Sequence, residues 1–138
     1  CITVKPTEEK PSLFTFWEGD KEALLSINNT AIEEYVAFCC TILQQYFSAI
    51  KNNFRLDWNS ENSKILSVTS INGFIIALTR QLNVNGIKDF SFYNNVFNDW
   101  TFDFSKENFP YTSSQYRKFS TQILKEAFKI SDDIIEKI

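Results

Sequence analysis

The residues that could support chemistry in this 138-residue chain are acids and cysteines, because it contains no histidine. Asp99, Asp103 and Glu107 lie close together in the sequence and could hold a hard cation such as Ca²⁺. Their spacing is not that of a calcium-binding loop, so we expect no metal site. The adjacent acids at 33–34 and 132–133 lie in helical patterns, where neighbouring side chains point about 100 degrees apart. We therefore expect no convergent acid pair.

Other common catalytic arrangements are also missing from the sequence. A thiol nucleophile needs a partner base, most often histidine, and none is present. Gly19, Gly73 and Gly86 stand alone, so there is no glycine-rich phosphate loop. Three cysteines are too few for a four-thiolate zinc site, and two of them, Cys39 and Cys40, are adjacent. We therefore expect no catalytic residue, no cofactor and no enzymatic activity.

The cysteines and the apolar runs indicate where the protein works. A disulfide between adjacent cysteines in a helix would be strained, so we expect free, buried thiols, which are typical of a reducing compartment such as the cytoplasm. The longest apolar run, Phe74 to Leu78, is far too short to span a bilayer, and no membrane partner is expected. The chain contains no methionine. We expect it to be a piece of a longer protein, with an upstream domain of the same chain as a partner and other proteins as possible partners.

The cations are concentrated in two bands, although the net charge is −3. Residues 63–88 contain three cations and no acid, and residues 112–131 contain four cations and one acid. Affinity for nucleic acid depends on many Lys and Arg contacts to phosphates, so an acidic chain predicts weak DNA binding at most. The candidate nucleic-acid residues are Arg80, Lys88, Arg117, Lys118 and Lys125. The alternative is that both bands are ordinary solvated helix faces.

The spacing of apolar residues predicts an all-α, or nearly all-α, domain. Thr30 to Glu33 is a capping-box sequence, and the apolar residues after it recur at intervals of three and four. The stripe expected to face the core is Ile32, Val36, Cys39, Leu43, Phe47, Ile50 and Phe54, with Tyr35, Phe38, Ile42, Tyr46 and Ala49 as a second stripe beside it. A helix this apolar is expected to be central to its domain.

Weaker patterns predict the remaining helices. They are expected at 21–27, from a serine at 63, 67 or 70 through Leu82, at 88–99, after a second capping box at 112–115, and after Ser131. Glycine inside a helix costs about 1 kcal/mol relative to alanine. Gly73 therefore predicts the close approach of another backbone, with contact to a ligand as the alternative, and Gly86 predicts a left-handed helix end.

These elements define the expected domain organisation. Residues 1–19 contain Pro6 and Pro11 and an alternating SLFTFW run, which predicts an extended N-terminal arm or a short strand. Residues 20–138 are expected to form the helical domain, with its core at about 30–130. The predicted fold is a single compact bundle of four to six helices.

The chain contains fourteen Phe, five Tyr and three Trp, which is enough to build a substantial aromatic core. Exposed aromatic rings beside Lys and Arg can instead stack on unpaired bases, and a phenylalanine-rich core can line a cavity for an apolar ligand. Trp58, Tyr111 and Tyr116 lie at predicted helix boundaries and are the aromatics expected to be partly exposed.

A series of landmarks between Ile42 and Glu126 suggests a family. They are Tyr46-Phe47-Ser48-Ala49-Ile50, Trp58, Thr69 with Gly73, Trp100 with Phe102 and Phe104, and Thr112-Ser113-Ser114. Their order resembles the C-terminal region of DGQHR-domain proteins, a bacterial group related to the regulators of DNA phosphorothioate modification. The DGQHR signature itself is absent from this chain and would lie upstream in such proteins.

The resemblance implies a non-catalytic helical interaction module in a DNA-associated regulatory or defence protein. The alternative is a small-molecule binding domain with an aromatic-lined cavity for an apolar ligand.

Overall fold

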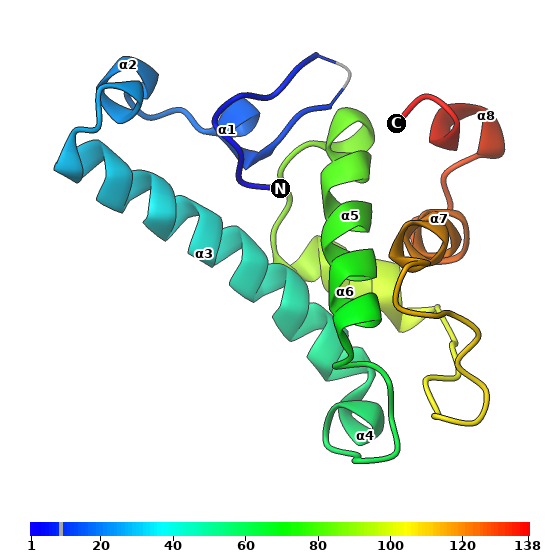
Figure 1. Cartoon of the computed structure of the whole chain (residues 1–138). Helices are drawn as coiled ribbons and strands as arrows, with labels where there is room; N and C mark the ends of the chain where they lie inside the picture. Colours follow the sequence, from blue (N-terminus) through cyan, green and yellow to red (C-terminus); the bar gives the residue numbers. More distant parts are fainter. Residues whose placement is uncertain (9) are drawn as a thin grey trace.

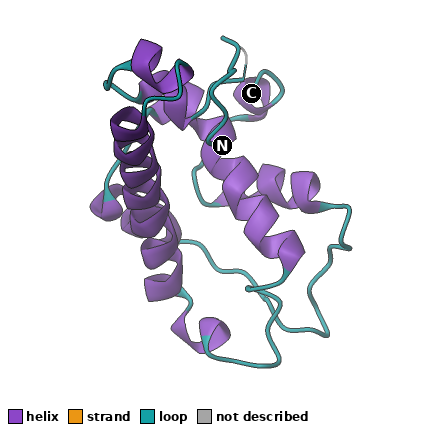
Figure 2. Ribbon diagram, turned by 60° about the vertical axis from the view of Figure 1, so that its left-hand side comes forward, coloured by secondary structure: helices purple, strands orange, loops and turns teal. Residues whose placement is uncertain are grey.

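The computed structural model describes residues 1–8 and 10–138, and in that part of the chain it contains helices and loops but no strand (Figures 1 and 2). The helices are α1 (Leu13–Phe16), α2 (Lys21–Leu25), α3 (Asn29–Asn53), α4 (Arg55–Trp58), α5 (Val68–Asn85), α6 (Phe90–Asn98), α7 (Tyr116–Glu126) and α8 (Asp132–Ile135). The all-α prediction is confirmed. The described chain has more helices than the four to six expected, because α1, α2, α4 and α8 are single turns of four or five residues.

The long helices form two packed pairs. Helix α3 packs against α6, and α5 packs against α7, with the single turn of α8 beside α7 (Figure 1). The loops that follow α4 and α6 are joined by a bridge between Ser63 and Ser105, where the Lys64 N–H donates to the Phe104 carbonyl at 2.7 Å. None of the described helices has the length and apolar character needed to cross a bilayer.

The larger core has Phe74 of α5 at its centre. Its ring lies 6.0 Å from that of Phe97 in α6 and 5.5 Å from that of Phe119 in α7, measured between ring centres. Phe104, from the loop between these two helices, lies 6.1 Å away. The buried Tyr46 of α3 donates its hydroxyl to the Phe74 carbonyl at 2.8 Å. Aromatic contacts of this kind stabilise a core beyond the burial of their area, so this cluster joins all four long helices.

The stripe of α3 predicted to face the core is partly wrong. The buried residues of α3 are Ala31, Tyr35, Cys39, Ile42, Tyr46, Ala49 and Ile50, which belong mostly to the second stripe. Val36 is 53% exposed, and Phe47 is only partly buried. Both stripes are apolar, so periodicity alone cannot choose between them. The choice is made by α6, whose Tyr93 ring packs 5.0 Å from that of Tyr46.

The described residues of the N-terminal segment, 1–8 and 10–19, do not form a uniformly extended arm. The Thr15 hydroxyl accepts from the Ser12 N–H at 3.1 Å and Ser12 caps the following amides, so a capping box opens α1. The alternating apolar pattern that suggested a strand is overridden by this local hydrogen bonding. The arm is also fastened to α3, because the Tyr35 hydroxyl donates to the Ile2 carbonyl at 2.7 Å. A second core therefore forms from Leu13, Phe14, Trp17, Leu24, Ala31, Tyr35, Cys39, Ile42 and Leu82.

The two predicted capping boxes do not start their helices where the sequence suggested. Helix α3 is capped by Asn28 and not by Thr30, because the Asn28 side chain accepts a backbone N–H three residues further on, at 3.2 Å. In the second box, Gln115 accepts from the Thr112 N–H at 3.0 Å, but α7 begins only at Tyr116. That box therefore shapes the turn before the helix.

Gly73 is a point of close approach between α5 and α7, but the neighbour is a side chain and not the predicted backbone. A Cβ placed on Gly73 would lie 2.3 Å from the Cδ1 atom of Phe119. The ring of Phe119 occupies the space that any larger residue would need. Gly86 ends α5 with the positive φ of 68° that the prediction requires, but its ψ of −159° lies outside the left-handed helical region, so the cap is not the predicted left-handed one.

We expect Gly73→Ala to lower the free energy of unfolding, although alanine favours a helix by about 1 kcal/mol. The added methyl group would overlap the Phe119 ring, and overpacking a core typically costs about 1–3 kcal/mol. Chemical denaturation measures the difference. In a Phe119→Ala background, Gly73→Ala should no longer lower the free energy of unfolding. An equal decrease in both backgrounds would rule out the steric cause.

Buried tyrosines make the stability of the fold sensitive to alkaline pH. Tyr46 and Tyr93 are 0% exposed. Burial raises the pKa of Tyr93 to about 12 and also raises the pKa of Tyr46, because a phenolate is unfavourable in an apolar core. An unfolded tyrosine has a pKa of about 10. Because the folded pKa is the higher one, the stability contributed by these phenols is complete below about pH 10 and is lost as the pH rises towards 12.

We expect Tyr93→Phe to reduce the loss of stability above about pH 10, because it removes one phenol whose pKa is raised by folding. Guanidinium denaturation at pH 8 and at about pH 10.5 measures that loss. Tyr116→Phe is the matched control, since Tyr116 is 38% exposed. A loss in Tyr93→Phe as steep as in the unmodified chain would show that Tyr93 does not contribute.

Candidate functional site

The structure uses Arg80, one of the predicted nucleic-acid residues, to hold helices together. Its Nη1 donates to the hydroxyls of Ser120 and Thr121, each at 2.8 Å. Its Nε and Nη2 donate to the backbone oxygens of Ile138 and Ile135, at 3.2 and 3.3 Å. Arg80 therefore fastens α5 to α7 and to the α8 segment, and most of its donors are occupied.

Lys118 and Lys125 share the outer face of α7. Both are exposed, and they lie opposite the buried side of the helix, which includes Phe119 and Ile123. Lys125 forms an ion pair with Asp132 at 2.8 Å, and this hydrogen bond raises the pKa of Lys125. An exposed lysine that is already paired with a carboxylate has less to offer a phosphate.

The remaining two predicted cations lie elsewhere. Lys88 precedes α6, and its Nζ lies 5.5 Å from the centre of the Phe92 ring. Arg117 is exposed on the flank of α7 and lines a surface hollow together with Arg80. Burial, together with the nearby guanidinium of Arg117, lowers the pKa of Arg80. The five cations thus occupy three separate places and do not form one row.

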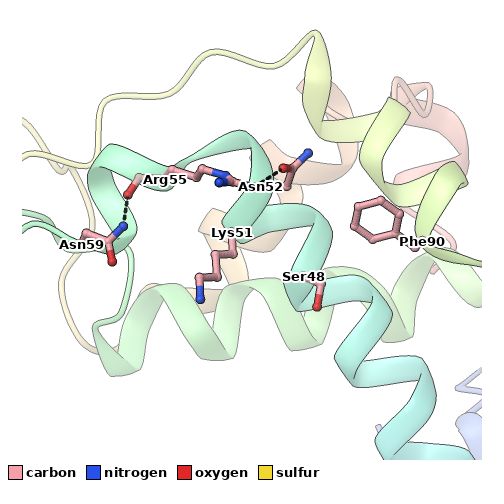
Figure 3. A pocket seen from close by; sticks show the side chains of 6 residues that line it. All are labelled: Ser48, Lys51, Asn52, Arg55, Asn59 and Phe90. Carbon is pink, nitrogen blue, oxygen red and sulfur yellow. Dashed lines mark hydrogen bonds between the residues drawn. The ribbon is translucent and has the colours of Figure 1, made fainter.

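Sequence reasoning missed another surface hollow, called here the α3–α4 hollow. It lies where the end of α3 meets α4 and the start of α6. It has a volume of about 420 Å³ and is lined by Ser48, Lys51, Asn52, Arg55, Asn59 and Phe90 (Figure 3). The lining contains two cations, three amide or hydroxyl side chains and one aromatic ring, and none of these residues is acidic. Such a hollow is suited to an anionic ligand.

The hollow exists because α3 ends at a buried aromatic residue. Phe54 leaves the helical conformation, with φ −129° and ψ 45°, and its ring packs 5.6 Å from Trp100 and 5.2 Å from Phe104. The chain therefore turns at this point and starts α4 at Arg55 in a new direction. Lys51 on α3 and Arg55 on α4 then border the same depression (Figure 3).

Amide side chains hold the rim of this hollow in place. The Arg55 Nη2 donates to Asn52 Oδ1 at 3.1 Å, and Asn59 Nδ2 donates to the Arg55 carbonyl at 2.9 Å. Asn52 in turn donates to Asn94 Oδ1 of α6 at 2.8 Å. The guanidinium of Arg55 is thereby oriented while most of its N–H groups remain available.

The two cations of the hollow make no ion pair within residues 1–8 and 10–138. The Lys51 Nζ lies 5.9 Å from the Trp58 ring centre, a cation–π contact that leaves its charge uncompensated. Phe90 is 38% exposed at the opposite side of the hollow. The sequence carried two hints of this site, namely the helix break at Phe54 and the boundary tryptophan at position 58.

The acids and cysteines do not assemble into a site. In the described part of the chain, no group of three or more His, Cys, Asp or Glu could hold a metal ion. Asp103 accepts from the Ser105 N–H at 2.9 Å and from Asn108 Nδ2 at 2.8 Å, and these hydrogen bonds lower its pKa. Cys39 is buried, which raises its pKa, whereas Cys40 is exposed, contrary to the expectation of buried thiols.

The aromatic side chains pack against one another. Phe102 and Phe104 lie 4.6 Å apart, and both rings also meet Phe119. The two surface hollows described here are lined mainly by polar and charged side chains. No observation therefore favours the alternative of an aromatic-lined cavity for an apolar ligand.

No family model, curated protein or solved structure matches the chain.

Proposed function

We propose that this chain is a non-catalytic helical module that binds single-stranded nucleic acid at the α3–α4 hollow. The observation that carries the proposal is the pair of cations, Lys51 and Arg55, that border one depression without an ion-pair partner in the described chain. Aromatic rings lie beside them, at Trp58 and Phe90.

The residue types match what an unpaired strand requires. Proteins that bind single strands combine cations for the backbone with aromatic rings on which bases stack. Lys51 and Arg55 supply the charges, and the partly exposed ring of Phe90 supplies an apolar surface. Asn59 and Ser48 add groups that can hydrogen-bond to base edges or sugars.

The size and charge of the site set the expected strength of binding. Each phosphate contact to a single strand contributes a salt dependence of about −0.7 in the slope of log affinity against log salt. Two cations therefore predict a shallow slope, and the net charge of −3 works against tight binding. The module is expected to bind weakly by itself and to act beside other binding surfaces.

The biological setting that we propose is a DNA-associated regulatory or defence protein of DGQHR type in the bacterial cytoplasm. The support is the order of landmarks in the sequence, several of which build the core. Tyr46, Ala49 and Ile50 face inward on α3, and Trp100 and Phe104 are buried in the loop after α6. In this setting, an upstream domain of the same protein would be the first partner of the module.

Fluorescence anisotropy with labelled single-stranded DNA at low salt tests the site. We expect Lys51→Glu combined with Arg55→Glu to weaken binding by about tenfold or more, which corresponds to about 1.4 kcal/mol. Lys118→Glu combined with Lys125→Glu is the matched control, because it reverses the same number of charges on an exposed face. Binding should survive in the control.

All four positions are exposed, so circular dichroism should confirm that both double variants remain folded. If the Lys118→Glu, Lys125→Glu variant lost binding and the Lys51→Glu, Arg55→Glu variant kept it, the site would lie on α7 instead. Equal loss in both would mean that only the overall charge matters. Tighter binding of duplex DNA than of the single strand would contradict the proposed preference.

A further inference from the structure

The hollow lined by Arg80 and Arg117, called here the Arg80–Arg117 hollow, lies beside the segment that follows α8. Helix α8 is at the other end of the molecule from α4 (Figure 1). The hollow has a volume of about 370 Å³, and it brings together the lead-in to α1, the helices α5 and α7, and the end of the chain. Its lining includes Lys10, Arg80, Arg117, Lys137 and Glu136. Cations from four separate segments therefore surround one depression that contains a single side-chain carboxylate.

The two arginines of this hollow have different roles. Arg80 has five N–H groups, of which four are used by the hydroxyls of Ser120 and Thr121 and by two backbone oxygens. It is therefore fixed in position and offers its charge and one remaining N–H. The Arg117 side chain donates no hydrogen bond within the described residues, so its planar fork is available for a ligand.

The two guanidinium groups line the same hollow and carry the same charge. Like charges in a partly dehydrated place repel, and burial together with Arg117 lowers the pKa of Arg80. An anion between them would relieve the repulsion and would also tie the Lys137 segment to α7. Because the positions of the helices fix Arg80 in advance, little ordering would be needed for binding.

We propose that the Arg80–Arg117 hollow binds a phosphate group, either as inorganic phosphate or as a small phosphomonoester. The volume is sufficient for such a group, and a bidentate arginine fork fits its oxygens. The proposal does not depend on nucleic-acid binding, since Lys51 and Arg55 lie in the hollow at the α4 end.

Phosphorus NMR titration of the whole chain tests this proposal, with inorganic phosphate and O-phosphoserine as separate probes. We expect saturable binding of one or both probes, and the tighter probe identifies the source of the phosphate group. Arg117→Gln should weaken phosphate binding by about tenfold or more, because the available guanidinium group of Arg117 is lost. Lys118→Gln is the control, since it removes one charge from the adjacent position on the outer face of α7.

Thermal unfolding provides a second readout, with sodium chloride at equal ionic strength as the reference. Phosphate stabilises many proteins by exclusion from their surface, so the informative quantity is the difference between variants. Bound phosphate should raise the Tm of the unmodified chain and of Lys118→Gln more than that of Arg117→Gln. The proposal is overturned if neither probe binds saturably, or if Arg117→Gln binds as well as the unmodified chain.

Discussion

The contact of the Phe74 ring with its aromatic neighbours is the interaction on which the rest of the structure depends. From a single position on α5, this ring meets Phe47 of α3, Phe97 of α6 and Phe119 of α7. The backbone at the same residue accepts the hydroxyl of Tyr46. Helix α7 packs along α5, whereas α3 packs along α6 and reaches α5 through Tyr46 and Phe47. Phe104 and Trp100 add to this connection, because each ring meets both Phe54 at the end of α3 and Phe119 of α7.

The candidate site is a consequence of the same core. Phe104 packs against both Phe74 and Phe54, so the buried cluster reaches the end of α3. Because Phe54 is held there, the chain must leave the helix and turn into α4. That turn places Arg55 beside Lys51 at the surface. An apolar constraint inside the protein therefore determines where two exposed cations lie.

The sequence predicts the elements of this fold better than their faces. Periodicity correctly predicts α3, α5 and α6, because long apolar repeats leave few alternatives. It fails to choose the inward stripe of α3, since Val36 and Tyr35 are both apolar enough and only the position of α6 distinguishes them. It also misses α1, where a hydrogen bond between Ser12 and Thr15 outweighs an alternating pattern.

The cationic residues are harder to predict than the core. Seven-residue spacing correctly places Lys118 and Lys125 on one face, but it says nothing of Asp132, which approaches Lys125 from the following helix. Arg80 looks like any exposed arginine in the sequence, whereas long-range contacts turn it into a support for α7. Lys51 and Arg55 are only four residues apart in the sequence, but no sequence pattern predicts that they line one hollow, because α3 ends between them.

The central role of Phe74 in the core can be tested by chemical denaturation. The measured quantity is the free energy of unfolding of Phe74→Ala, compared with that of Phe47→Ala. Phe74 is 1% exposed, so we expect a loss of about 3–5 kcal/mol, as for other buried aromatic residues. Phe47 is only partly buried and should lose clearly less. Equal losses, or a larger loss for Phe47→Ala, would contradict the account.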